Sequence, residues 1–104
     1  MDKNNFEIML LDVMSCKWSH TLLKLIASNV HRPGELQKNI ADISVKVMNE
    51  SLLRLVKYRM LTKTLYNEVP PRVEYKLTSL GKDALSLLND THELRKKYEA
   101  LGDD

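Results

Sequence analysis

The segment from residue 69 to residue 81, VPPRVEYKLTSLG, constrains the fold more than any other part of this chain. Its two adjacent prolines lack the N–H group that a strand ladder needs, so they mark a turn. Apolar and charged residues then alternate from Arg72 to Leu77, which is the period of a strand with one buried face. The preceding residues 61–67, LTKTLYN, suit a partner strand because they are rich in Thr, Leu and Tyr. The sequence therefore predicts a β-hairpin that leads directly into a helix.

Two helices are predicted at the start of the chain from the spacing of its apolar residues. The first has one apolar face that runs from Phe6 to Met14. Ser15 is placed to cap a second helix, which carries Trp18 near its start and ends near Asn29.

A short turn at residues 41–43 joins two further predicted helices. Pro33 suits the first turn of the earlier helix, which reaches Ile40, and Ser44 is placed to cap the later one, over about residues 45–58. Two helices joined by so short a turn predict a helix-turn-helix. With the hairpin as a wing, the predicted fold is α+β and mainly α, a winged helix-turn-helix.

The two faces of the helix over residues 45–58 differ in chemistry. Met48, Leu52 and Leu55 repeat at helical spacing and are predicted to face the core. The other face is polar and basic, and such a helix can enter the major groove of duplex DNA, where asparagine can pair with adenine and glutamate can accept from cytosine. A solvated face without a ligand explains the same residues equally well. The candidate contact residues on this helix are Ser44, Lys46, Asn49, Glu50, Ser51 and Arg54.

Further candidates follow from the charge distribution. Residues 17–72 carry ten Lys or Arg against four Asp or Glu, although the whole chain has a net charge of only +2. Concentrated positive charge suits contact with phosphates. For Arg72 the alternative is a surface ion pair with Glu68 or Glu74, worth less than about 1 kcal/mol. The candidates outside the fourth helix are Lys17, Arg32, Lys63 and Arg72.

The composition is that of one globular domain. The chain has 104 residues, of which 43% are hydrophobic and 29% are charged. No apolar run approaches the roughly 20 residues of a membrane span, and the N-terminus lacks the layout of a signal peptide. The single cysteine excludes an internal disulfide and fits a reducing cytoplasm. His20, His31 and His92 lie far apart and no catalytic or phosphate-binding motif is present, so the sequence predicts neither an enzyme nor a cofactor.

Four segments together resemble one known family. Residues 69–81 follow the pattern VPPRVEYxLTxxG, Lys17-Trp18 and Glu35-Leu36 resemble two upstream motifs, and residues 43–55 resemble a recognition-helix signature. The chain is therefore similar, over about residues 10–90, to the HxlR-type winged helix-turn-helix transcriptional regulators, which are related in architecture to MarR-type regulators. The resemblance implies that the helix over 45–58 and the wing contact DNA.

The chain also departs from that family's pattern. Many relatives sense oxidants through a cysteine before or within the first helix, whereas residues 1–15 contain none and Cys16 stands where the family has a glycine. A thiol near a helix N-terminus beside Lys17 can have a lowered pKa and act as a redox switch, and an inert thiol is the alternative. Pro33 displaces the phenylalanine that the family has before Glu35-Leu36. We therefore expect a different backbone conformation where the chain enters the third helix. Arg59 replaces a glycine, so the fourth helix is expected to end without a left-handed residue.

The last predicted helix begins at Ser79, with Thr78 as its cap, and continues to about residue 101. Its inward residues are predicted to be Leu80, Ala84, Leu87 and Leu88. Leu94, Tyr98 and Leu101 form a stripe beyond the winged core, which predicts packing against a second subunit.

We therefore expect residues 1–104 to form a single domain whose N-terminal helix and C-terminal helix, about residues 79–101, dimerise. The resemblance implies a homodimer that binds a palindromic operator in double-stranded DNA, in the cytoplasm at the nucleoid and without a membrane partner. A winged-helix module for protein contact, with no DNA target, is the alternative. The operator, the sign of regulation and any small-molecule effector stay open.

Overall fold

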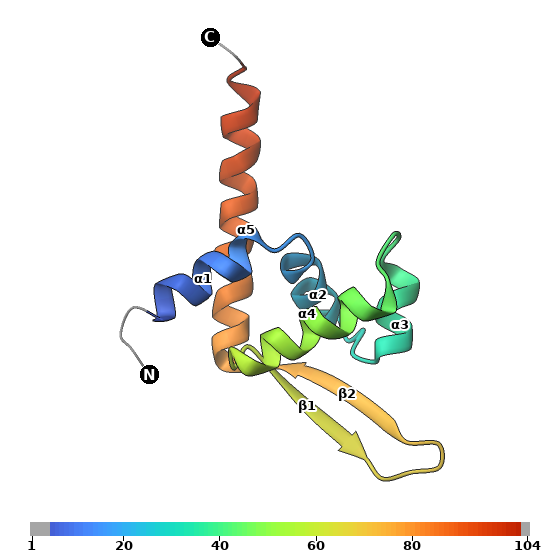
Figure 1. Ribbon diagram of the computed structural model, residues 1–104. Helices are drawn as coiled ribbons and strands as arrows, with labels where there is room; N and C mark the ends of the chain where they lie inside the picture. The colour runs from blue at the N-terminus through green and yellow to red at the C-terminus, as the bar shows by residue number, and fades with distance from the viewer. Residues whose placement is uncertain (1–4, 103–104) are drawn as a thin grey trace.

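A computed structural model describes residues 5–102, which form five helices and one two-stranded antiparallel sheet. The predicted fold class, mainly helical with a β-hairpin, is confirmed. In Figure 1 the hairpin projects from one side of the helices, and the last helix rises on the other side. The elements in chain order are α1 (Asn5–Ser15), α2 (Ser19–Ala27), α3 (Pro33–Asn39), α4 (Val45–Lys57), β1 (Leu61–Tyr66), β2 (Arg72–Leu77) and α5 (Ser79–Ala100).

Side-chain caps define the starts of two helices, as predicted. The Ser44 hydroxyl oxygen accepts a hydrogen bond from the Val47 N–H at 3.1 Å, and Thr78 Oγ1 accepts one from the Gly81 N–H at 2.9 Å. The prediction for Ser15 is wrong: it lies in the last turn of α1, where its hydroxyl donates to the Asp12 carbonyl at 3.2 Å. The helix α2 begins at Ser19 without a side-chain cap, because its N-cap residue is Trp18, whose indole has no acceptor oxygen.

The wing is the hairpin of β1 and β2, whose pairing runs from Leu61 with Leu77 to Tyr66 with Arg72. Residues 67–71, with both prolines, form the tip as predicted. The alternation of β2 places Glu74 on the face opposite Tyr75, where it was expected to be exposed, but this residue is only 8% exposed. The segment between α2 and α3 covers that part of β2, where the Tyr75 N–H donates to the His31 carbonyl at 2.9 Å.

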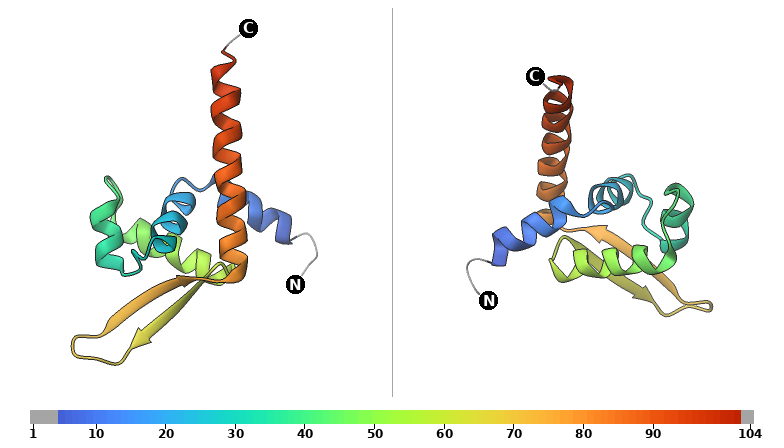
Figure 2. Two further views of the ribbon diagram at one scale, coloured as in Figure 1. Left: turned by 180° about the vertical axis from the view of Figure 1, so that it is seen from behind. Right: turned by 45° about the horizontal axis from the view of Figure 1, so that its top comes forward.

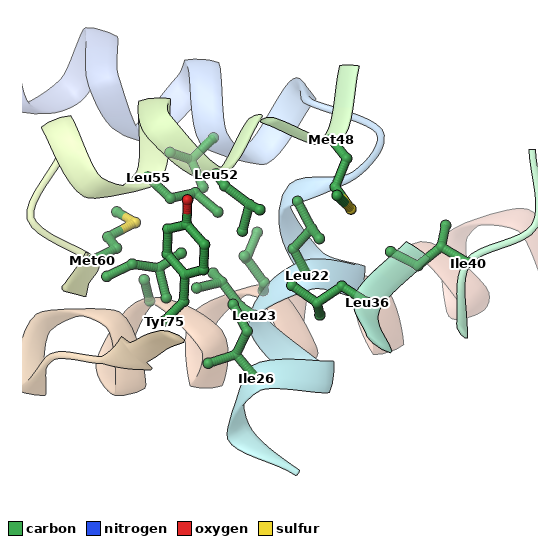
Figure 3. Packing of buried hydrophobic residues seen from close by; sticks show 14 of the residues in the cluster. Leu22, Leu23, Ile26, Leu36, Ile40, Met48, Leu52, Leu55, Met60 and Tyr75 are labelled. Carbon is green, nitrogen blue, oxygen red and sulfur yellow. The ribbon is translucent and has the colours of Figure 1, made fainter. Parts of the chain in front are cut away.

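The core joins the helix-turn-helix to the base of the wing. Figure 3 shows Tyr75 directed from β2 toward Leu52 and Leu55 of α4, with Leu22 and Leu23 of α2 beside them. The predicted inward residues of α4, which include Met48, are confirmed. These contacts hold α4 in place and leave its opposite face in solvent.

Only a narrow face of α5 packs against the core. Ala84 and Leu88 are buried as predicted, but Leu80 and Leu87 are 39% and 42% exposed, so their predicted inward direction is wrong. The residues of α5 that are buried where it packs against α2 and β2 form a stripe through Gly81, Ala84 and Leu88.

The C-terminal half of α5 extends away from the core, as both views in Figure 2 show. Leu94 and Tyr98 on this part of the helix, and Leu101 directly after it, are 67% to 76% exposed. On α1, three large apolar side chains are also exposed, namely Phe6, Ile8 and Leu11. Within residues 5–102, no helix combines the length and the apolar composition that crossing a bilayer requires.

The end of α4 corrects the expectation for Arg59. This residue itself adopts the left-handed conformation, with φ 63°. The turn lets the Met60 N–H donate to the Leu55 carbonyl at 2.9 Å. A left-handed residue with a Cβ is strained, whereas glycine adopts this conformation freely.

We expect Arg59→Gly to raise the free energy of unfolding by about 0.5–1 kcal/mol. The gain is the relief of strain minus the entropy cost of glycine in the unfolded chain. Thermal and urea denaturation measure the change. The control is Lys57→Gly in the last turn of α4, where the backbone is helical and glycine should cost about 0.5–1 kcal/mol. A loss of stability in both variants would contradict the assigned strain.

Candidate nucleic-acid interface

The exposed face of α4 carries the residues best placed to meet a ligand. Lys46, Asn49 and Glu50 are all exposed on the first half of this helix. Among residues 5–102, none of the three side chains forms a hydrogen bond or an ion pair within the chain. Ser44 is also exposed; its hydroxyl oxygen is used for capping, but its proton is free to be donated. This face therefore offers donors, an acceptor and a positive charge near a helix N-terminus.

A hollow of about 370 Å³ lies between α4 and the wing. Asn49 and Leu53 line it from α4, and Lys63 and Val73 line it from the two strands. Pro33, at the start of α3, closes one side. The structure thus places two predicted contact residues, Asn49 and Lys63, on one continuous surface although they lie on different elements.

The prediction for Ser51 as a contact residue is wrong. Ser51 is only 4% exposed: it borders the buried stripe of Met48 and Leu52, and the core extends far enough around α4 to cover it. The side chain faces the protein interior and cannot reach a ligand on the outer face.

Arg54 is directed to α1 and away from the first half of α4. Its Nε lies 3.8 Å from Asp12 Oδ2, and the Tyr58 hydroxyl donates to the same oxygen at 2.7 Å. That hydrogen bond, together with burial and the charge of Asp12, raises the pKa of the Tyr58 hydroxyl. Arg54 therefore helps to attach α1 to the end of α4, and its charge is partly balanced by Asp12.

Glu74 is the centre of an ion-pair cluster, of which the sequence indicated only the pair with Arg72. Its carboxylate lies 3.2 Å from Arg72 Nε, 3.8 Å from Arg32 Nε and 3.5 Å from His31 Nε2. Arg72 also pairs with Glu68 at 3.4 Å and stacks on the Tyr66 ring at 4.1 Å. The expected surface pair of Arg72 is present with Glu68, whereas the carboxylate of Glu74 that also pairs with Arg72 is buried. The cluster joins the start of α3 to the wing and balances the charges of two predicted contact residues, Arg32 and Arg72.

Lys17 lies away from the hollow between α4 and the wing. Its ammonium is 4.7 Å from the centre of the Trp18 ring, and it lines a second cavity together with residues of α5. The half-buried Cys16 lines the same cavity. Burial raises the pKa of its thiol, but hydrogen bonds from the Ser19 side chain and the backbone of Trp18 and Ser19, with the charge of Arg54, lower it below the ordinary value.

Exposed apolar side chains on α4 were not among the predicted contacts. Val45, Val47 and Leu53 lie on the outer face and are 51%, 37% and 51% exposed. Apolar groups in a major groove can contact thymine methyl groups. The only sequence signal was that these three fall outside the buried spacing of Met48, Leu52 and Leu55.

A helix-turn-helix with an exposed second helix and an adjoining hairpin defines a winged helix-turn-helix protein. The model of the HxlR-like helix-turn-helix family matches residues 13–102. The chain belongs to this family, whose members are transcriptional regulators and not enzymes.

The chain is similar to several proteins of the same kind. A Fusobacterium mortiferum protein, named as the regulatory protein MalR, is 32% identical over 84 residues, which cover 80% of this chain and 79% of MalR. An HTH-type transcriptional regulator of Synechocystis sp. is 31% identical over 81% of this chain, and the match spans 62% of its own length. A MarR-family regulator structure from Enterococcus faecalis has a TM-score of 0.78 and 26% identity, covering 96% of this chain and 91% of that one. The oxidised redox regulator HypR has a TM-score of 0.73 and 25% identity, covering 84% and 90%.

Proposed function

We propose that this protein is a sequence-specific regulator that binds double-stranded DNA as a homodimer. The observation that supports this function best is the surface shared by Asn49 of α4 and Lys63 of the wing. Next to it, Lys46 and Glu50 project from the same helix without partners among residues 5–102. A recognition helix in the major groove and a wing beside it require such an arrangement.

The contact residues divide by chemistry. Asn49 and Glu50 carry the groups that pair with base edges, and Val47 suits a thymine methyl group. Ser44, Lys46 and Lys63 provide donors and positive charge for phosphates. Arg32, Arg54 and Arg72 are held by carboxylates, so we assign them to the positioning of α1, α3 and the wing. Since Lys17 faces another cavity, we exclude it from the DNA contacts.

A second copy of the chain is the proposed partner of the exposed apolar surfaces on α1 and α5. Six large apolar side chains are at least half exposed there, more than a monomer readily leaves in water. A two-fold axis between copies would present two α4 helices to successive major grooves, about one DNA turn apart. The operator would then be palindromic, and we place the protein in the cytoplasm at the nucleoid.

We expect Lys46→Ala and Lys63→Ala each to weaken DNA binding several-fold and to reduce the salt dependence. Each phosphate contact contributes about 0.9 to the slope of log K against log salt, and each substitution removes one contact from both subunits of the dimer, so each variant should lower the slope by roughly two. Fluorescence anisotropy on a labelled duplex at several salt concentrations measures both quantities. Asn49→Ala should instead weaken binding to a selected operator more than binding to random duplex.

The matched control is Lys96→Ala on the C-terminal half of α5, which removes one positive charge far from α4. It should leave affinity and slope close to those of the unchanged protein. No duplex binding at low salt would favour the alternative of a protein-contact module. Equal losses in all three lysine variants would show a general charge effect and would contradict the proposed interface.

We also propose redox control through Cys16, supported by the lowered pKa of its half-buried thiol. Two thiols from two subunits can each lose a proton and an electron to diamide and join in a disulfide, while diamide becomes the hydrazine. We expect diamide to change the DNA affinity of the unchanged protein and not that of Cys16→Ser. An equal response of both proteins in the anisotropy assay would end this part of the proposal.

A further inference from the structure

A second cavity, of about 310 Å³, lies where the loop between α1 and α2 meets α5. It is distinct from the hollow at the wing, because no residue lines both. Lys17 and His20 line it from the α1–α2 side, and His92 and Arg95 line it from α5. No aspartate or glutamate is among the residues that line it.

The two fixed positive charges of this cavity have no counter-charge within the described part of the chain. Neither Lys17 nor Arg95 forms an ion pair among residues 5–102. The nearest acidic residues in the sequence are engaged elsewhere: Asp12 binds Tyr58 and Arg54, and Glu93 pairs with Lys96 at 3.3 Å. An anion in the cavity would therefore meet positive charge from two sides without competition from a carboxylate.

His20 and His92 add hydrogen-bonding groups to the cavity, and a side-chain contact fixes the orientation of the His20 ring. His20 Nε2 and Asn89 Oδ1 are 2.6 Å apart, which orients the His20 ring, and the His20 and His92 ring centres are 5.8 Å apart. The floor of the cavity is partly apolar, since Met14 and Leu88 also line it. A cavity of this size with an apolar floor and a few convergent polar groups suits a small molecule.

We propose that this cavity binds a small organic carboxylate, with its charged group between Lys17 and Arg95 and its apolar body against Met14 and Leu88. The planar guanidinium of Arg95 can bind a carboxylate through two parallel hydrogen bonds. Lys17 lies over the ring of Trp18, so a carboxylate that draws the ammonium away changes the surroundings of this indole. Trp18 is the sole tryptophan of the chain, which makes its fluorescence a specific reporter.

The experiment is a titration of the reduced full chain, without DNA, with phenylacetate as the probe. Trp18 fluorescence and calorimetry should both show saturable binding with a Kd of roughly 1 mM, as expected for a probe of this size. Phenylacetamide, which has the same shape and no charge, should bind at least about tenfold more weakly. Inorganic phosphate should also bind more weakly, since it leaves the apolar floor uncovered.

Variants assign the binding to this cavity. Arg95→Gln and Lys17→Gln should each weaken phenylacetate binding at least about tenfold, by loss of a charged hydrogen bond. The control Lys96→Gln removes the same charge from the neighbouring position of α5 and should change the affinity less than about twofold. No saturable binding, equal binding of phenylacetamide or equal effects of all three variants would each overturn the proposal. Because the titration contains no DNA, its result does not depend on the proposed DNA binding.

Discussion

We expect Gly81→Ala to lower the free energy of unfolding by about 3 kcal/mol or more, with a fall in Tm of more than roughly 10 °C. Gly81 lies in the first turn of α5, directly against the backbone of Met60, which precedes β1. A Cβ at this position would overlap the Met60 carbonyl oxygen and lie 2.9 Å from the carbonyl carbon. Because the obstacle is backbone, α5 itself would have to move.

The cost should be this high because Met60 is held on several sides. Its carbonyl accepts a hydrogen bond from the Thr78 N–H at 3.1 Å, and Thr78 Oγ1 donates to the neighbouring Arg59 carbonyl at 2.6 Å. Met60 is also fully buried in the core. Circular dichroism during thermal and urea denaturation measures the loss of stability.

The matched control is Gly34→Ala in the first turn of α3. A Cβ at Gly34 meets no atom within 4 Å, so alanine should be neutral or stabilise the helix by up to about 1 kcal/mol. If both variants are equally stable, the close approach of α5 to Met60 is not what requires glycine at position 81.

We expect the double variant Leu94→Glu with Tyr98→Glu to be monomeric at concentrations at which the unchanged protein is a dimer. Two carboxylates on the exposed stripe of α5 would have to be buried without partners in the proposed interface. A monomer contacts one half-site and loses the gain from simultaneous binding, so operator affinity should fall by at least about 100-fold. Analytical ultracentrifugation and anisotropy measure the two effects.

The control for this variant is Lys96→Glu, which makes the same change of two units in net charge. Lys96 lies on the side of α5 opposite to Leu94 and Tyr98, because it is two positions from each along the helix. It should leave the dimer intact and reduce operator affinity only slightly. A double variant that stays dimeric would exclude the stripe from the interface, whatever its effect on DNA binding.

Helices and strands were predictable because their signals are local. The alternation from Arg72 to Leu77 and the prolines before it predicted the wing, and β2 has those bounds. Ser44 and Thr78 predicted two helix starts, and each hydroxyl caps a backbone N–H three residues later. The prediction that Ser15 caps α2 was wrong because a serine between two apolar stretches fits the end of a helix as well as the start of one.

The candidate interface was predictable only in part. Lys46, Asn49 and Glu50 are exposed as expected, because the buried spacing of α4 already determined its outer face. Burial of Ser51 required knowing how far the core extends around α4, and burial of Glu74 required knowing that the α2–α3 segment covers β2. Neither follows from the period of a single element.

The sequence by itself determined the winged helix-turn-helix, since turn chemistry, capping residues and apolar period all act within a few residues. Only the tertiary structure decided which positive charges are free. Arg54 meets Asp12, and Arg32 meets Glu74, across about forty residues of chain in each case, and chain folding alone brings such groups within 4 Å. An isolated arginine in a sequence shows its charge, whereas its availability to DNA depends on the carboxylates that the fold places beside it.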